Sequence, residues 1–205
     1  RLYENLPGRS RPFWRYWYGE FQAAFPEALG DVDLETFYRA INVVHPSLIR
    51  VEADEVTYNL HILLRVEVEN ELLEGKLRVA EVPDAWNAKM EEYLGVEPPD
   101  HAQGSLQDIH WTFAGGMGVF PSYTLGNVIS AQLMEKIRVV VPDLDAQGEA
   151  GEFGPLLGWL RENVHRHGRK FTPAELLKRA TGKELDAGAW IAYIKAKYSE
   201  IYGLN

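Results

Sequence analysis

The stretch VEADEVTYNLHILLRVEVENELLE, residues 51–74, decides how this chain is interpreted as a fold. It contains neither Gly nor Pro, the two residues that most often end a helix, so the sequence predicts one long helix from Val51 to Glu74. Residues 65–69 alternate between apolar and charged side chains, and only this part of the stretch also fits a strand.

Helix signals continue on both sides of this stretch. Ser10 is placed to cap a helix that carries aromatic residues as far as Phe21 and stops at Pro26, and Asp33 is placed to cap the next helix, which ends near Pro46. The other predicted helices span residues 83–94, 121–140, 153–165, 173–180 and 186–202, with an ordered loop at 97–118 and a surface loop at 147–154. The sequence therefore predicts an all-α chain with at most a minor β element.

Composition narrows the class of protein. The chain has 205 residues, of which 46% are hydrophobic and 25% charged, as in ordinary globular domains. A formal charge of −9 argues against nucleic acid as a partner, because phosphate binding needs a basic face. Without cysteine there are no disulfides or thiolate sites, which fits a reducing cytoplasm.

The ends and the hydropathy of the chain add further expectations. No stretch approaches the roughly 18 apolar residues of a membrane span, and no leader resembles a signal peptide. The chain opens at Arg1 without an initiator Met, and Leu2, Tyr3 and Leu6 already have helical spacing. We therefore expect the sequence to be part of a longer polypeptide.

A polar stripe is expected on the long helix. Arg50, Asp54, Tyr58, His61 and Arg65 succeed one another at steps of three or four residues, which places them on one face. The stripe would either line a cleft and offer an arginine to an anionic group, or form an internal ladder of ion pairs, Arg50 with Asp54 and His61 with Arg65 or a neighbour. The neighbouring acidic residues are expected to be solvated: Glu52, Glu55, Glu69 and Glu71.

The densest mixture of polar and aromatic residues is GSLQDIHW at residues 104–111, with GGMG after it at 115–118. Asp108 is close enough along the chain to orient the imidazole of His110, as carboxylates often do for functional histidines. The alternative is a turn-rich loop whose His and Trp fill the core. The glycines indicate a close approach of the backbone to something else.

Tyr123 begins the helix predicted at 121–140. A tyrosine at a helix start can donate a hydrogen bond to a developing oxyanion, but it can equally be an aromatic that packs. No HExxH, Gly-x-Ser-x-Gly, P-loop or dinucleotide fingerprint is present. His165 and His167 fit better as cations at a helix end than as metal ligands.

Two of these segments resemble signature motifs of the carboxypeptidase Taq family. The first is Ile49-Arg50-Val51-Glu52-Ala53-Asp54, and the second is the segment from Gly104 to Trp111. The opening Arg1-Leu2-Tyr3-Glu4-Asn5 is similar to the residues that come directly after the family's His-Glu-Ser-Gln segment. The resemblance extends in order over essentially the whole chain, 1–205.

The resemblance implies a cytoplasmic zinc carboxypeptidase, commonly a homodimer, that removes single residues from peptide C-termini. It implies a nearly all-helical fold with a deep groove, of which residues 1–140 would form a wall and residues 152–203 the C-terminal helices. Zinc would be held by the two His of HExxH and the Glu of His-Glu-Ser-Gln, all before Arg1. This chain alone would therefore bind no catalytic zinc and be inactive.

Roles for individual residues are also implied by the resemblance. His110 would contact the substrate near the metal or stabilise the oxyanion, with Tyr123 as a second donor. Arg50 would bind the free C-terminal carboxylate, directly or through Asp54. The remaining substrate-binding residues would be Gln107 and Asp108, which hold His110 in place.

One position departs from the family pattern. The family has Phe-Gly-Tyr-Phe-Pro-Ser-Tyr where this chain has Met117-Gly118-Val119-Phe120-Pro121-Ser122-Tyr123, so the hydroxyl expected at Val119 is missing. If that hydroxyl is the family's oxyanion donor, Tyr123 is not. The alternatives to a carboxypeptidase are a non-catalytic helical peptide-binding module and a dipeptidase or oligopeptidase of the same zinc group.

Overall fold

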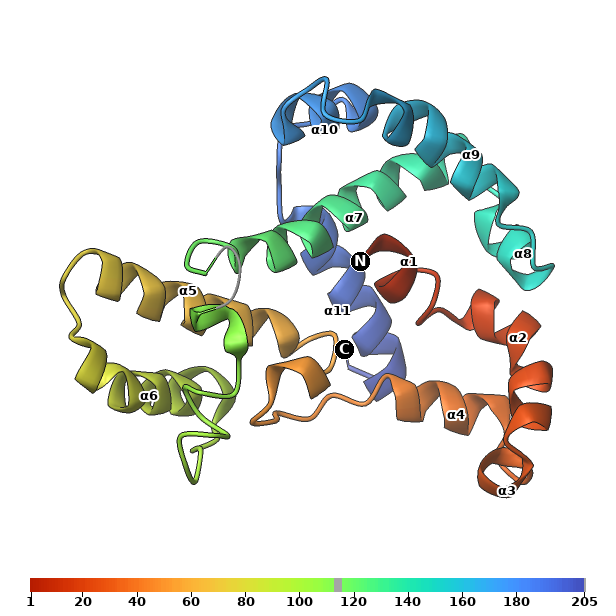
Figure 1. Ribbon diagram of the computed structural model, residues 1–205. Coiled ribbons are helices and arrows are strands. Elements are labelled where there is room, and N and C mark those ends of the chain that lie inside the picture. Colours follow the sequence, from red (N-terminus) through yellow and green to blue (C-terminus); the bar gives the residue numbers. More distant parts are fainter. Residues whose placement is uncertain (113–115, 205) are drawn as a thin grey trace. The chain divides into compact units, whose positions relative to one another are not determined.

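The computed structural model describes residues 1–112 and 116–204 (Figure 1). Every regular element in this part of the chain is a helix, which confirms the all-α prediction. The residues form two compact units, one of residues 1–42 and 126–205 and the other of residues 43–125. None of the described helices is both long and apolar enough to cross a membrane.

The unit of residues 1–42 and 126–205 holds most of the helices. Its helices are α1 (Leu2–Asn5), α2 (Arg11–Ala24), α3 (Pro26–Leu29), α4 (Leu34–Ile41), most of α7 (Pro121–Val140), α8 (Leu144–Glu149), α9 (Gly154–Asn163), η4 (His165–His167), α10 (Pro173–Thr181) and α11 (Gly188–Tyr202). One core cluster joins Leu6, after α1, with Met134 and Ile137 of α7 and Leu156 and Leu160 of α9.

The unit of residues 43–125 is smaller and carries the candidate site. Its helices are η1 (Arg50–Glu52), α5 (Tyr58–Leu73), η2 (Val79–Glu81), α6 (Val82–Leu94), η3 (Ile109–Trp111) and the first residues of α7. The core between α5 and α6 consists of Leu64, Trp86, Met90 and Leu94. Trp111, from the loop that follows α6, packs against this core.

Most predicted helix ends are confirmed because their signals are local. The side chains of Ser10 and Asp33 accept hydrogen bonds from the backbone at the start of α2 and α4. Thr172 forms the capping box of α10 with Glu175, and Gly95 ends α6 with a φ of 68°. These side chains act within one turn of their own position.

The long helix predicted over 51–74 is wrong at its first part. Arg50 lies in the short η1 turn and α5 begins only at Tyr58. The reason is Asp54, whose carboxylate accepts hydrogen bonds from the backbone N–H of Val56 at 2.8 Å and of Thr57 at 2.9 Å. An aspartate in that role stands before a helix and not within it.

The surface loop predicted at 147–154 is wrong at its start, because α8 extends to Glu149. Gly148 is buried and lies against Pro12 at the start of α2, so close that an added Cβ would meet the proline ring at 3.3 Å. The glycine that indicated a loop is therefore a point of close helix packing.

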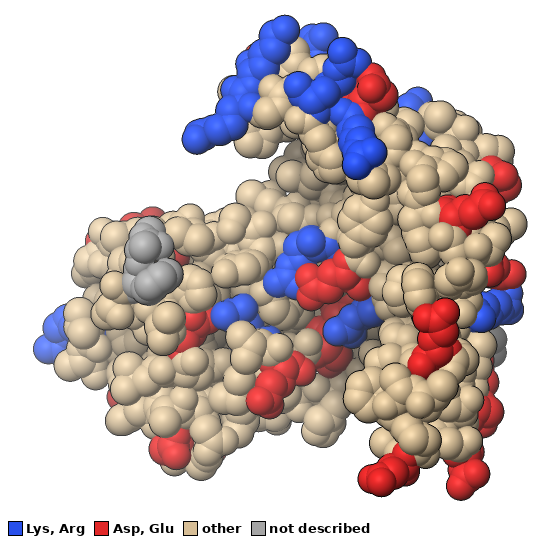
Figure 2. Space-filling view, turned by 45° about the vertical axis from the view of Figure 1, so that its right-hand side comes forward, with Lys and Arg blue, Asp and Glu red and all other residues tan. Residues whose placement is uncertain are grey.

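Charge is unevenly distributed along the chain. Between Arg161 and Lys183 the sequence has seven Lys or Arg and two Asp or Glu, although the net charge of the whole chain is −9. Figure 2 shows these basic side chains gathered at its top, over the segment from the end of α9 to α10.

Candidate functional site

Four of the six residues predicted for the site form one continuous polar chain. They are Arg50 of η1, Asp108 and His110 of the loop around η3, and Tyr123 in the first turn of α7. All lie in the unit of residues 43–125. Segments that are far apart in sequence thus bring a cation, a carboxylate, an imidazole and a phenol together.

The polar chain begins with a buried ion pair between Arg50 and Asp108. Arg50 donates from Nε to Oδ2 of Asp108 at 2.7 Å, and its NH2 lies 2.7 Å from the same oxygen. The exposed fractions of the two side chains are 10% and 6%. A charge-assisted pair out of water is strong and sets a definite geometry.

The other oxygen of Asp108 holds His110. Its Oδ1 contacts Nδ1 of the imidazole and accepts a hydrogen bond from the His110 backbone N–H at 3.2 Å. The opposite ring nitrogen, Nε2, lies 3.2 Å from the hydroxyl of Tyr123. With a proton on Nδ1, a neutral His110 accepts from Tyr123; with a second proton, His110 donates from Nε2.

Aromatic rings surround the guanidinium of Arg50. Its Cζ lies 5.2 Å from the ring centre of Phe120, 5.3 Å from that of Tyr123 and 5.9 Å from that of Tyr58, whose hydroxyl accepts a hydrogen bond from NH1 at 3.1 Å. Rings at these distances stabilise a cation. They also leave little of the guanidinium exposed.

Gln107 supports Arg50 and not His110. Its side chain accepts from the backbone N–H of Arg50 at 2.8 Å and donates to the carbonyl of Leu48 at 2.8 Å. This amide joins the loop of residues 104–112 to the segment before η1.

Asp54 lies outside the polar chain. Besides the backbone of α5, its carboxylate accepts from the hydroxyl of Thr57 at 2.7 Å and from the backbone N–H of His45 at 3.0 Å. The alternative of an ion-pair ladder, in which Arg50 pairs with Asp54, does not hold for Arg50, which pairs with Asp108.

The environment of Asp108 favours its charged form. Burial raises the pKa of this carboxyl, but the hydrogen bonds from His110 and Arg50 more than offset it, and the net pKa lies below the usual value. Asp108 is thus ionised at neutral pH and faces Nδ1 of His110 as a carboxylate.

A second group of ionisable residues lies on α5 beneath the loop. Arg65 and Glu69 are fully buried, with NH2 2.9 Å from Oε1, an ion pair whose angles are not those of a hydrogen bond. Burial lowers the pKa of Arg65 to about 10. Its guanidinium stacks on Trp111, 3.0 Å from the ring centre, and Oε2 of Glu69 accepts from the N–H of Gly118 at 3.1 Å.

His61 is also on α5 and is 1% exposed. Neither of its ring nitrogens has a hydrogen bond of normal geometry, although a backbone group of Ser47 is near enough to act on the ring. Burial, and next the charge of Arg50, lower the pKa of His61 to about 4. In the ladder alternative His61 pairs with Arg65 or a neighbour, and the structure pairs Arg65 with Glu69 instead.

The sequence analysis places Tyr58 in the polar stripe but gives no role to Phe120, and it misjudges two of the acidic residues. Phe120 lies under Arg50 and is 1% exposed, and Tyr58 binds the guanidinium. Glu69 was expected to be solvated and is 2% exposed, as Glu55 is 4% exposed. The spacing of Arg65 and Glu69, four residues on a helix, is the signal that predicts their pairing.

Among the described residues no three His, Asp or Glu side chains come together as a metal site requires. His110 alone does not provide a ligand set. The glycine-rich segment after it is only partly described, and Gly115 lies outside the described residues.

An apolar pocket adjoins the same loop. Its volume is about 310 Å³, and Trp111, Leu106 and Met117 line it together with residues of α5, η2 and α6. Trp111 donates to the carbonyl of Ser105, which fixes the indole in the wall. The pocket is large enough for an apolar side chain, and Trp111 comes directly after His110.

Comparison with known families gives a match along nearly the whole chain. The family model described as carboxypeptidase Taq (M32) metallopeptidase matches residues 1–198. The chain is 46% identical over 201 residues to Carboxypeptidase 1 of Bacillus subtilis, covering 98% of the chain and 40% of that protein. It is 47% identical over 204 residues to Thermostable carboxypeptidase 1 of Thermus thermophilus, covering 99% of the chain and 39% of that protein.

Solved structures agree with these relatives. The crystal structure of M32 carboxypeptidase from Deinococcus radiodurans R1 superposes with a TM-score of 0.95 at 50% identity, covering 99% of this chain and 41% of that one. A structure of Pyrococcus furiosus carboxypeptidase gives a TM-score of 0.92 at 40% identity, with coverages of 96% and 39%. The chain thus spans about 40% of the length of the curated relatives it matches.

Proposed function

The chain belongs to the carboxypeptidase Taq (M32) metallopeptidase family, and we propose that it is the C-terminal part of a metallocarboxypeptidase that releases single residues from peptide C-termini. The observation that supports a substrate-binding role is the chain Arg50–Asp108–His110–Tyr123, which ends in partly exposed donors. Such a series of linked groups fixes the imidazole of His110, with Nδ1 at Asp108 and Nε2 at Tyr123.

His110 and Tyr123 are proposed to bind the reacting carbonyl. A protonated His110, held by the ionised Asp108, donates its N–H from Nε2, and the Tyr123 hydroxyl next to it supplies a second donor, an O–H. Donors fixed before the reaction stabilise negative charge as it develops. Because Val119 has no hydroxyl, Tyr123 is the phenol that this chain offers at the start of α7.

Arg50 is proposed to act mainly through Asp108. Its Nε and NH2 contact Asp108 and its NH1 donates to Tyr58, so most of its donors already bind other residues of this protein. The alternative is the role implied by the family resemblance, direct binding of the substrate's C-terminal carboxylate. Gln107, which holds the Arg50 backbone, serves either role, and Asp54 serves by fixing the start of α5.

The metal is proposed to be Zn²⁺, bound by residues outside this chain. A metal ion supplies an activated water and polarises the carbonyl in such peptidases. The share of the reaction proposed for this chain is substrate contact and proton placement by His110 and Tyr123. A cytoplasmic location and a homodimeric state are further parts of the proposal, and both rest on the family resemblance.

The test uses the full-length protein and pairs of peptides with a free or an amidated C-terminus. His110→Gln is expected to lower kcat/KM on free peptides about 100-fold, as loss of an oxyanion donor does. The matched control is His101→Gln, an exposed histidine of the same loop, which should leave kcat/KM unchanged. Arg50→Ala is expected to cost about 2 kcal/mol, or roughly 30-fold.

The two roles for Arg50 give different results in the same experiment. If Arg50 acts through Asp108, then Asp108→Asn reproduces the loss and kcat falls. If it binds the carboxylate directly, KM rises for free peptides alone and the preference over amidated peptides disappears. Unchanged kcat/KM in His110→Gln, or peptidase activity of residues 1–205 alone, would contradict the proposal.

A further inference from the structure

A basic surface covers residues 161–183, from the end of α9 to just beyond α10, in the unit of residues 1–42 and 126–205 (Figure 2). Its seven cations are all exposed: Arg161, Arg166, Arg169, Lys170, Lys178, Arg179 and Lys183. The rest of the chain has 14 Lys or Arg and 28 Asp or Glu. Positive charge is thus concentrated in one short segment of an acidic chain, away from the polar chain that ends at Tyr123.

Carboxylates neutralise only part of this basic surface. Three of its cations form ion pairs, Arg166 with Glu162, Lys178 with Glu184 at 2.6 Å and Lys183 with Glu135 at 3.0 Å. All six side chains are more than half exposed, so water weakens these pairs and an incoming anion can exchange with them. Among the described residues no carboxylate lies within ion-pair distance of the other four cations: Arg161, Arg169, Lys170 and Arg179.

Phe171 holds part of the basic surface in a definite arrangement. The Cζ of Arg179 lies 4.3 Å from the centre of the Phe171 ring, and the Nζ of Lys170 lies 5.6 Å from it. The ring of His167 packs against the same phenyl group, with 5.4 Å between the ring centres. A guanidinium that stacks through its face keeps the N–H groups of its edge available, because all of them lie in its plane.

A hollow of about 370 Å³ adjoins this stack, and its lining consists of Phe171, Glu175, Lys178 and Arg179. Its volume is within the roughly 300–1,000 Å³ that is common for ligand sites. The carboxylate of Glu175 accepts hydrogen bonds from the backbone N–H and the hydroxyl of Thr172, both at 2.8 Å, and these bonds lower its pKa. The one carboxylate of the lining is therefore engaged in the capping box of α10, and two cations line the hollow with it.

We propose that this basic surface binds an acidic peptide segment of a partner protein, a stretch with several Asp or Glu side chains. Four of the seven cations are arginines, whose fork of donors matches the two oxygens of a carboxylate. Arginine clusters are a recurrent means of recognising acidic motifs. The hollow beside Phe171 takes one carboxylate, at Lys178 and Arg179, and the exposed cations of residues 161–170 meet its neighbours.

Two other polyanions fit this surface less well. In residues 161–183, a stretch that the structure describes in full, no large apolar side chain is exposed, so a membrane would be held by charge alone, without inserted side chains. A nucleic acid continues beyond the basic surface, where the acidic remainder of the chain repels its phosphates. A short acidic peptide needs to cover the basic surface only.

The test is a titration of the full-length protein with N-terminally labelled oligoglutamate, followed by fluorescence anisotropy. The peptide has an amidated C-terminus, so that a carboxypeptidase does not shorten it. Oligoglutamine of equal length is the uncharged probe, and the other polyanions are oligouridylate and phosphatidylcholine vesicles that contain phosphatidylserine, the latter measured by co-sedimentation. Saturable binding of oligoglutamate that weakens as salt is raised is expected, with weaker binding of the other three probes.

Variants connect the binding to the basic surface. The double variant Arg169→Gln with Lys170→Gln is expected to weaken binding of oligoglutamate about tenfold, because it removes two exposed cations that bind carboxylates. The matched control is Lys76→Gln with Arg78→Gln, which changes the net charge equally at two exposed positions of the other unit and should bind as the wild type does. Arg179→Gln removes the guanidinium at the hollow and should weaken binding by a similar factor. Circular dichroism verifies that each variant is folded.

Three results would overturn the proposal. The first is the absence of saturable binding of oligoglutamate, or binding that oligoglutamine reproduces. The second is equal binding by the wild type and the double variant Arg169→Gln with Lys170→Gln, and the third is tighter binding of oligouridylate or of the vesicles than of oligoglutamate. None of these results bears on the proposed peptidase function, because the basic surface shares no residue with the polar chain that ends at Tyr123.

Discussion

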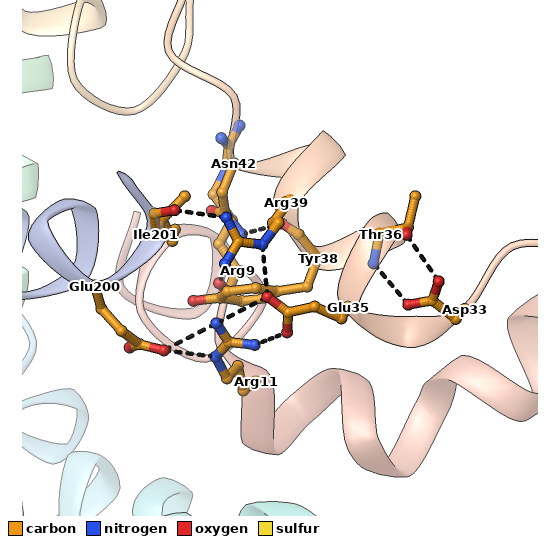
Figure 3. Close-up of polar contacts among 10 residues, drawn as sticks. All are labelled: Arg9, Arg11, Asp33, Glu35, Thr36, Tyr38, Arg39, Asn42, Glu200 and Ile201. Atoms are coloured by element: carbon orange, nitrogen blue, oxygen red, sulfur yellow. Dashed lines mark hydrogen bonds and ion pairs between the residues drawn. The ribbon is translucent and has the colours of Figure 1, made fainter. Parts of the chain in front are cut away.

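Two networks of charged residues in this molecule both consist of Arg–Glu pairs, one buried and the other exposed to solvent. In the unit of residues 43–125, Arg65 and Glu69 pair inside the protein, with side-chain exposures of 0% and 3%. In the other unit, Arg11 and Arg39 pair with Glu35, whose side chain is 48% exposed (Figure 3).

The two surroundings shift the pKa of the paired residues in different ways. The hydrogen bond from Arg11 lowers the pKa of Glu35, so the exposed pairing favours the ionised form. Burial lowers the pKa of Arg65 to about 10, so the buried site opposes the charge in spite of its partner. An exposed pair adds little to stability because water already solvates both ions, whereas a buried pair becomes costly as soon as one partner is removed.

The largest expected effect comes from breaking the buried pair. Arg65→Met in the full-length protein leaves Glu69 charged and buried, which should reduce the free energy of unfolding by about 3–5 kcal/mol. Urea unfolding monitored by circular dichroism measures it.

The matched control is the double variant Arg65→Met with Glu69→Gln. It removes both charges and keeps an oxygen for the N–H of Gly118, so it should recover most of the lost stability. If Arg65→Met alone were as stable as the wild type, burial would not distinguish the two networks.

The next largest expected effect is a loss of folding stability at low pH, caused by His61. The unfolded chain protonates His61 near pH 6.5, while the folded protein keeps it neutral down to about pH 4. As pH falls through this window the unfolded state binds more protons, so folding stability declines, by roughly 3 kcal/mol at pH 4 from this residue. The stability is fully present above pH 6.5.

His61→Asn, which does not titrate, should flatten the stability profile between pH 6.5 and 4. The control is His167→Asn, a partly exposed histidine of η4 with no such burial. The measurement is Tm against pH for the three proteins, and equal slopes in all of them would show that His61 is protonated in the folded state. Arg50 and Asp54 are the charged groups that act on His61, in opposite directions.

The difference between local and distant contacts explains which features the sequence predicts well. Ser10, Asp33 and Thr172 act on backbone groups within one turn, and the helices that they begin are where the sequence places them. Asp108 and His110 are two residues apart, so their contact is also within reach of sequence reasoning. Local hydrogen bonding depends on spacing, which a sequence displays directly.

The failures are those that depend on distant partners or on burial. Arg50 was placed on a helix facing Asp54, but its partner Asp108 is 58 residues further along the chain. Glu69 is a charged residue of the kind expected on a solvated helix face. It is buried because Trp111 packs on its partner Arg65 and Gly118 binds its carboxylate. A periodic pattern identifies a face of a helix but not what the rest of the chain lays on it.

The smallest expected effect is in the exposed network, and it completes the comparison. Arg39 donates from Nε to Glu35 at 2.8 Å and from NH1 to the carbonyl of Ile201 at 2.7 Å, with a side chain 53% exposed. Arg39→Met keeps the stem and removes the charge, and should cost less than about 1 kcal/mol because water replaces both contacts. The difference from wild type should shrink further in high salt, which screens exposed ions and leaves the buried Arg65–Glu69 pair almost unaffected. Urea unfolding of Arg39→Met and Arg65→Met at low and high salt measures both, and a loss of several kcal/mol in Arg39→Met would mean that exposure does not separate the two networks.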